Sequence, residues 1–209
     1  MSDFVNSVDI LGDDVLTDSI IEKTLESYAD DVVKSIGSYA FSKCTALINV
    51  NLPNVQEINN YAFNDCTALT SVIAPLVETR VNFYAFQNCL NLANVDFPLL
   101  KRIDGSAFSG CAKITSVDFP LVTYIGNQAF AKTGLATLIL RNETMVQNGG
   151  YIAINTPIAS GTGYIYVPSS LVDSYKADSN WSTYANQFRA LEDYTVDGTT
   201  TGELDPNKI

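Results

Sequence analysis

The chain has 209 residues, of which 46% are hydrophobic and 17% are charged, and it carries a formal net charge of −11 with no histidine. This length and apolar content allow a sizeable buried core and exclude disorder along the whole chain. The negative charge argues against nucleic-acid binding, which needs clustered Lys and Arg, and the lack of histidine removes the commonest general base and metal ligand.

The first 35 residues form an acidic segment with nine acidic and two basic side chains. The stretch LTDSIIEKTLESY predicts an amphipathic helix whose inward side chains are Ile20, Ile21 and Leu25. Alternatively, TLESYADDVVKSI aligns with ALINVNLPNVQEI further along the chain and would be a degenerate copy of the repeat that follows. In both cases we expect residues 1–35 to cap the first edge of the repeats.

Residues 36–140 repeat one phrase five times, beginning with IGSYAFSKCTALINVNLP at Ile36. The Ala-Phe pairs fall at 40/41, 62/63, 85/86, 107/108 and 129/130, in steps of 22, 23, 22 and 22 residues. A fixed period of this length is typical of a solenoid in which each coil contributes one strand. One coil cannot bury its apolar face alone, so we expect the five coils to stack around a continuous core.

Each repeat predicts a short strand that ends at a proline, because proline has no N–H to continue a ladder. The inward apolar positions lie two residues apart, as Val50 and Leu52 do, and recur in every repeat. The strands should therefore lie parallel, with the intervening side chains facing outward. The outward side chains that we propose as ligand contacts are Asn49, Asn51, Ser71, Asn94, Asp96, Ser116 and Asp118, and the remaining outward positions are Ile73, Thr137 and Ile139.

After each proline the chain turns, and we expect a short helical turn carrying the Ala-Phe pair. Such a turn should begin at residues that tolerate left-handed backbone or cap helices, which here are Gly37, Asn59, Asn82, Asp104 and Gly126. The phenylalanines should fill the interior as one column. Together these features predict an α/β solenoid.

Residues 141–194 read as a C-terminal cap. YIYVP repeats the strand-then-proline phrase, and SSLVDSYKAD predicts a helix. Trp181 and Tyr184 should lock this segment onto the stack. Residues 195–209 have the polar composition of a flexible tail.

The repeat pattern I-G-x-x-A-F-x-x-C-x-x-L-x-x-V-x-L/F-P resembles the leucine-rich repeats of the BspA type, which occur in bacterial surface proteins and phage tail-associated proteins. The segment GTGYIYVPSSLVDSYKADSNWSTYANQF is similar to the C-terminal closing module of the same proteins. The resemblance implies binding of a ligand or surface without catalysis, and it names no ligand. It implies a location on a virion or a cell surface.

Neither a secretory signal nor a membrane-spanning run is visible, which favours a virion component or a fragment of a larger system and leaves the cytoplasm open. We expect no membrane insertion, no cofactor and no metal.

Cys44, Cys66, Cys89 and Cys111 occupy one position of four successive repeats. Zinc sites need close cysteine pairs and often histidine, and neither occurs. A disulfide between Cys44 and Cys66 is the alternative, but stacked Cβ atoms about 4.8 Å apart lie beyond the ~3.8 Å of a disulfide. We expect a reduced, buried row that packs as small hydrophobic side chains.

Tyr39, Tyr61 and Tyr84 form a second row, which could stack sugar rings or simply cover the core, and we favour the second. For the whole chain, we expect a binding module that presents a rigid repeat surface to a protein or a polysaccharide. A structural spacer or assembly subunit without its own ligand is the alternative. No catalytic constellation is evident.

Overall fold

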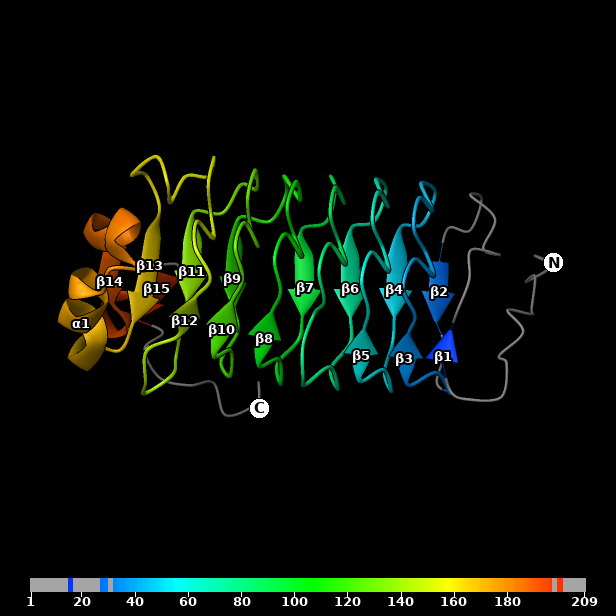
Figure 1. Ribbon diagram of the computed structural model, residues 1–209, viewed down its shortest axis with the longest axis horizontal. Coiled ribbons are helices and arrows are strands. Elements are labelled where there is room, and N and C mark those ends of the chain that lie inside the picture. The colour runs from blue at the N-terminus through cyan, green and yellow to red at the C-terminus, as the bar shows by residue number, and fades with distance from the viewer. Residues whose placement is uncertain (1–14, 17–26, 30–31, 197–198, 201–209) are drawn as a thin grey trace.

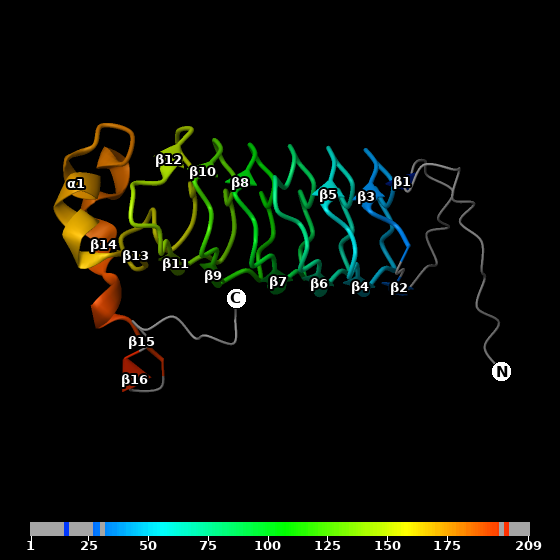
Figure 2. The ribbon, with the colours of Figure 1, turned by 90° about the horizontal axis from the view of Figure 1, so that it is seen from below.

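The computed structural model describes residues 15–16, 27–29, 32–196 and 199–200. These residues form an elongated stack of coils, each of which adds one short strand to each of two parallel ladders (Figure 1). The two ladders lie along opposite edges of the stack when it is seen from below (Figure 2). The protein is a parallel-strand β-solenoid.

The first ladder carries the strands that end before the prolines. β2 (Ser27–Ala29), β4 (Asn49–Asn51), β6 (Ser71–Ile73) and β7 (Asn94–Asp96) make one sheet. β9 (Ser116–Asp118), β11 (Thr137–Ile139), β13 (Tyr164–Val167) and β14 (Phe188–Ala190) make the next sheet. Val50 pairs with Val72, and Val72 with Val95. Equivalent residues of successive repeats are thus neighbours in space.

The second ladder runs along the other edge. It contains β1 (Val15–Leu16), β3 (Ser35–Ile36) and β5 (Glu57–Ile58), followed by β8 (Arg102–Ile103), β10 (Tyr124–Ile125) and β12 (Gln147–Asn148). Val81 joins the two groups through parallel bridges to Ile58 and Ile103.

The expected helical turns at the Ala-Phe pairs are wrong: the described residues of 36–140 contain turns and no helix. The backbone N–H of Phe41 donates to the carbonyl of Ala62 in the next coil at 2.7 Å, and every later coil repeats this bond. Tyr39 and Lys43, on either side, have φ of 64°. A helix needs right-handed residues whose N–H groups bond within the same coil, so bonding between coils excludes it.

The interior contains a single column of phenylalanine rings, as predicted. The ring centroids of Phe41 and Phe63 lie 4.9 Å apart, and the next steps, to Phe86, Phe108 and Phe130, are 5.1, 5.3 and 5.5 Å. All five rings are fully buried. Burial of this column and of the Leu, Ile and Val columns beside it supplies the main stabilising term of the fold.

The cysteines also form the reduced, buried row that we predicted. The Cys66 thiol donates to the carbonyl of Phe41 at 2.9 Å, and those of Cys89 and Cys111 donate to Phe63 and Phe86 at 3.1 Å. The row continues as Thr133, whose hydroxyl donates to the carbonyl of Phe130 at 2.8 Å. Each of these three thiols donates to a carbonyl of the preceding coil.

The C-terminal region first continues the stack and then folds against it. β12 and β13 extend the two ladders, and the N–H of Phe130 donates to the carbonyl of Ile152 as it would to a further Ala-Phe turn. There follow η1 (Ser169–Leu171), α1 (Val172–Ala177), η2 (Ser182–Gln187), β14, η3 (Leu191–Asp193), β15 (Thr195–Val196) and β16 (Thr199–Thr200).

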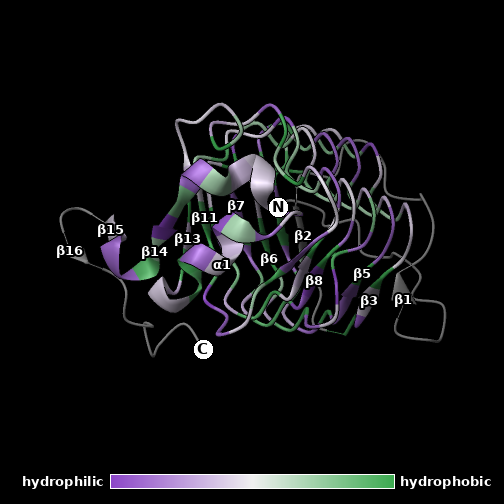
Figure 3. Cartoon of the chain, turned by 60° about the vertical axis from the view of Figure 1, so that its left-hand side comes forward, coloured by the Kyte–Doolittle hydropathy of each residue, from purple (hydrophilic) through white to green (hydrophobic). Residues whose placement is uncertain are grey.

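Three buried aromatic side chains fix this segment to the last coil. The Tyr175 hydroxyl accepts from the N–H of Val146 at 2.7 Å, and Trp181 Nε1 donates to the carbonyl of Val146 at 2.9 Å. The Tyr184 hydroxyl accepts from the N–H of Ala153 at 3.0 Å. Figure 3, which looks partly along the stack, shows α1 in front of the coils.

At the N-terminal end, β2 pairs with β4 so that Tyr28 lies opposite Val50. This register is the one given by aligning TLESY with ALINV, so residues 27–29 occupy the strand position of a coil. Residues 17–26, which hold most of the alternative helix, lie outside the described residues, as do residues 201–209 of the expected tail. The remainder of that tail contains β15 and β16, paired antiparallel.

Candidate functional site

The outward face of the first ladder holds all seven predicted contact residues. Since side chains alternate across a strand, the residue on each side of every inward valine points to solvent. Six of the seven are exposed and Ser71 is half-buried. Asn49 Oδ1 accepts hydrogen bonds from the hydroxyls of Thr70 and Ser71 at 3.1 and 3.0 Å. The face is therefore a row of small polar groups, partly fixed by bonds between coils and interrupted by Ile73, which is 48% exposed.

A break between β7 and β9 divides this face. No ladder pairs these two strands among the residues that the structure describes. Asn94 and Asp96 lie on one side of the break, and Ser116 and Asp118 lie on the other. Val95 is only partly buried, whereas Val72 and Val117 are buried. Four of the seven predicted residues therefore flank the one place in the described ladder where neighbouring strands separate.

Two phenylalanines lie in the core next to the break. Phe97 and Phe119 hold the inward position that is Leu52, Ala74 and Leu140 elsewhere. The Phe97 ring lies 6.1 Å from that of Phe86 and 6.4 Å from that of Phe108. Because rings of this size in two successive coils occupy the core under the strands, we expect their bulk to hold β7 and β9 apart.

Asp118 differs from the other predicted residues because it forms an ion pair. Arg141 Nε lies 3.0 Å from Asp118 Oδ1, and Arg141 Nη2 lies 2.7 Å from Oδ2, a two-pronged arrangement that fixes both groups. Ile139, which lies between Asp118 and Tyr166 in register, is 3% exposed although it is on the outward side. This end of the face is thus more ordered and less open than the sequence suggested.

Sequence reasoning missed the aromatic end of the same face. Tyr164 and Tyr166 are the outward residues of β13, and Arg189 follows on β14. The guanidinium carbon of Arg189 lies 4.5 Å from the ring centroid of Tyr164, and the rings of Tyr166 and Tyr194 are 4.8 Å apart. The signal was present, because the recognised phrase YIYVP fixes which of its residues face out.

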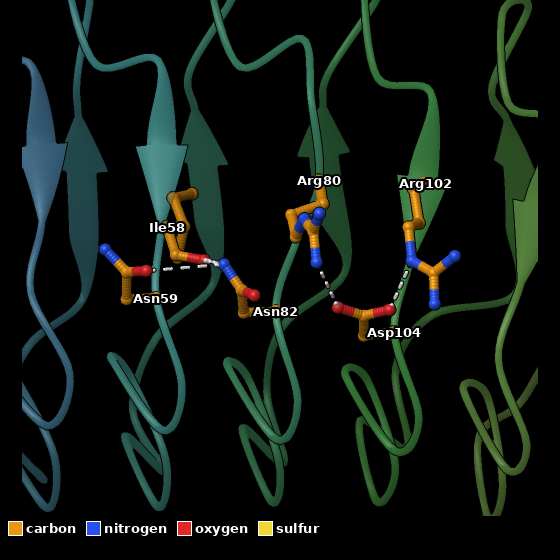
Figure 4. A network of polar contacts seen from close by, with 6 residues as sticks. All are labelled: Ile58, Asn59, Arg80, Asn82, Arg102 and Asp104. Atoms are coloured by element: carbon orange, nitrogen blue, oxygen red, sulfur yellow. Dashed lines mark hydrogen bonds and ion pairs between the residues drawn. The ribbon is translucent and has the colours of Figure 1, made fainter.

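A buried carboxylate lies on the second ladder, where the turns begin (Figure 4). Asn59 Nδ2 and Asn82 Nδ2 donate to the carbonyls of Ile36 and Ile58, both at 3.0 Å. Asp104 takes the next position and has no N–H in its side chain to do the same. Its carboxylate is instead 2.6 Å from Arg102 Nε and 3.8 Å from Arg80 Nη1, and it is 0% exposed.

The tyrosine row on the turns is a closed stack. The rings of Tyr39 and Tyr61, and those of Tyr61 and Tyr84, are nearly parallel with centroids 4.8 Å apart. Both faces of Tyr61 are therefore covered by protein, which leaves no room for a sugar ring on that residue. This geometry favours the structural interpretation of the row.

The described residues contain no group of three or more Cys, Asp or Glu side chains placed to hold a metal ion. Within the same residues, no helix has both the length and the apolarity that crossing a bilayer requires.

Comparison with known proteins agrees with the repeat architecture. The family described as “BspA type Leucine rich repeat region” matches residues 29–151 in six copies. Among solved structures, a leucine-rich repeat protein from Bacteroides ovatus is similar at 21% identity with a TM-score of 0.46. The similarity covers 79% of this chain and 55% of that one, so this chain spans little more than half of that protein. None of the curated proteins matches.

Proposed function

Because the chain belongs to the BspA-type leucine-rich repeat family, we propose that it is a non-catalytic binding module that recognises a protein or a polysaccharide through the outward face of its first ladder. The observation that carries the proposal is the row of small polar side chains on this face, which is in register on each side of the break. Its predicted contacts are Asn49, Asn51, Ser71, Asn94, Asp96, Ser116 and Asp118.

The rigidity of the scaffold supports this proposal. Each coil bonds to its neighbours through the turn N–H groups as well as through strand ladders, and its phenylalanine is buried between those of adjacent coils. A surface held in this way loses little conformational freedom when a partner binds. Small polar residues on a flat sheet then offer many weak hydrogen bonds over a long contact.

We further propose the biological setting and the roles of the flanks. By family resemblance, the module serves adhesion at a bacterial surface or host recognition by a phage tail. Residues 1–35 and 141–194 act as caps that cover the two ends of repeats 36–140, as the contacts of Tyr175 and Trp181 with Val146 support at the C-terminal end.

Capture of partners from bacterial cell-envelope extract tests the proposal. A variant with Asn51→Lys, Asn94→Lys and Ser116→Lys places three long cations on the face without breaking the Asp118–Arg141 pair. A matched variant with Ser38→Lys, Asn60→Lys and Ala112→Lys places them on exposed turn positions. We expect the face variant to capture at least about tenfold less material than wild type, and the matched variant to capture as much as wild type.

Equal capture by the two variants contradicts the assignment of the face. If wild type captures nothing from envelope extract or from intact cells, the chain is instead the structural spacer that the sequence leaves as the alternative.

A further inference from the structure

The C-terminal end of the outward face combines one aromatic ring with a row of small hydroxyls. Ser116, Thr137 and Tyr164 are direct neighbours across β9, β11 and β13, since Thr137 pairs with both of the others (Figure 1). Tyr164 is 38% exposed, Ser116 is exposed and Thr137 is half-buried. The large Tyr164 side chain is therefore followed by the small side chains of Thr137 and Ser116, one on each successive parallel strand.

Arg189 covers one face of the Tyr164 ring. Arg189 belongs to β14, on the far side of β13 from β11, and its guanidinium lies over one face of the ring at 4.5 Å. Because Arg189 comes from the β14 side, we expect the other face to be the one nearer to β11, where Thr137 is the register partner of Tyr164. Arg189 Nη1 donates to the carbonyls of Asn186 and Phe188 at 3.0 and 2.7 Å. The guanidinium is thus fixed, and it braces the ring in place.

Polar groups border the space in front of the ring. Thr137 and Ser116 carry hydroxyls at the next two positions of this row. In the adjoining row of the sheet, Asp118 and Arg141 form the two-pronged ion pair, and one third of the Asp118 side chain remains exposed. Donors and acceptors that are already fixed lose little freedom when they bind a ligand.

We propose that Tyr164, Thr137, Ser116 and Asp118 form a subsite for a neutral pyranose ring of a glycan. A pyranose has an apolar C–H face, which suits the open face of Tyr164, and a rim of hydroxyls, which suits the groups around it. The proposal deepens the binding function and rests on it, because it assigns a ligand class to one end of the same face.

The same groups fit other ligands less well. An apolar peptide side chain needs an apolar pocket, but Thr137 and Ser116 carry hydroxyls and Ile139 is 3% exposed. An anionic ligand meets the Asp118 carboxylate on a chain with a net charge of −11. A neutral polyhydroxyl ring avoids both penalties.

Affinity electrophoresis in soluble dextran, galactan, mannan and glycol chitin tests the proposal, since binding to any of them retards the protein. We expect wild type to be retarded by at least one polymer. Tyr164→Ala should weaken that binding about tenfold or more, whereas Tyr164→Phe, which keeps the ring face, should stay within about threefold of wild type. Thr137→Tyr puts a ring in the proposed space and should also abolish retardation.

Tyr151→Ala is the matched control, because Tyr151 is 61% exposed on a turn away from this face and its loss should change nothing. Thermal unfolding of each variant separates loss of binding from loss of fold. The subsite is refuted if none of the four polymers retards wild type, or if Tyr164→Ala is retarded like wild type. If Tyr164→Ala loses only protease-sensitive partners from envelope extract, the sugar assignment is refuted and the binding function stands.

Discussion

At the residue scale, burial raises the pKa of thiols in the cysteine row and so lowers their reactivity. Burial raises the pKa of Cys44 to about 11, and the pKa of Cys89 is also raised, mainly by burial. For Cys66 the hydrogen bond with Cys89 is the first cause of the raised pKa, with burial second. Since only the thiolate is a good nucleophile, these thiols are unreactive in the folded chain.

We expect the folded protein at pH 8 to resist alkylation by iodoacetamide, and all four cysteines to react at once in denaturant. Mass spectrometry after timed labelling measures both. Rapid labelling of the native protein, or a mass two hydrogens lower without reductant, contradicts the buried reduced row.

The same raised pKa values make stability depend on pH. Below about pH 9 the thiols are protonated in both states, so their contribution is fully present. Between about pH 9 and 11 the unfolded chain ionises its thiols while folded Cys44 stays neutral, so the free energy of unfolding falls as pH rises. Urea titrations from pH 7 to 11 measure this fall, and a stability that rises over pH 9–11 contradicts it.

Asp104 holds the position that Asn59 and Asn82 hold in the two preceding coils, but it has a carboxylate in place of their side-chain amide. Arg102→Ala leaves its buried carboxylate with Arg80 alone, at 3.8 Å, and should cost about 2–3 kcal/mol of unfolding free energy. In an Asp104→Asn background the new amide can donate to the Val81 carbonyl, as Asn82 does to Ile58. The cost of Arg102→Ala should then drop below about 1 kcal/mol.

Arg80→Ala is the matched control and should cost less than about 1 kcal/mol, because this side chain is half-exposed and forms no short bond. Equal costs of Arg102→Ala in the two backgrounds would show that no coupling exists.

At the scale of elements, Phe119 is the residue to change. Phe119→Leu gives β9 the inward residue of β4 and β11 and should let β7 and β9 pair. The amides expected to gain partners are those of Thr115 and Phe97, because their equivalents Thr70 and Leu52 bond across coils at 2.8 Å. Hydrogen exchange at these two amides should slow about tenfold or more, with Thr70 as an internal reference. Unchanged exchange would mean that ring bulk does not cause the break.

The strands were predictable from the sequence because single residues mark where each one ends and which of its faces points inward. Pro53 and its equivalents marked the strand ends, and Val50 with Leu52 marked the inward face. The turns were not predictable in detail, because their left-handed backbone falls at residues such as Tyr39 and Lys43, whose types do not mark it, and not at Gly37 or Asn59. The outcome depends on bonds such as Phe41 N to Ala62 O, which exist only once coils have stacked.

The candidate face was predicted in position but not in detail. Alternation about Val95 and Val117 was enough to find Asn94, Asp96 and Ser116. It could not show that Arg141 holds Asp118, because that contact depends on where the chain lies after β11. The phrase YIYVP did mark Tyr164 as an outward residue, and only its place beside Thr137 needed the structure.

At the scale of the whole molecule, the proposed C-terminal cap packs on the last coil through Tyr175, Trp181 and Tyr184. Trp181→Ala removes a buried ring and a bond to the Val146 carbonyl, so it should cost about 3–5 kcal/mol in global unfolding. Trp181→Phe, which keeps most of the ring and loses the bond, should cost less. If circular dichroism in urea finds no loss for Trp181→Ala, this segment does not cap the stack.

The central claim is that repetition along the chain places one binding face on β4, β6, β7, β9 and β11, with a break in strand pairing between β7 and β9. Hydrogen exchange with and without the captured envelope fraction tests it most directly. The account predicts that slowed exchange on binding concentrates in residues 49–51, 71–73, 94–96, 116–118 and 137–139 and in Tyr164–Val167. Slowing confined to the turns at 38–44, 60–66 and 83–89, with these strands unchanged, would contradict it.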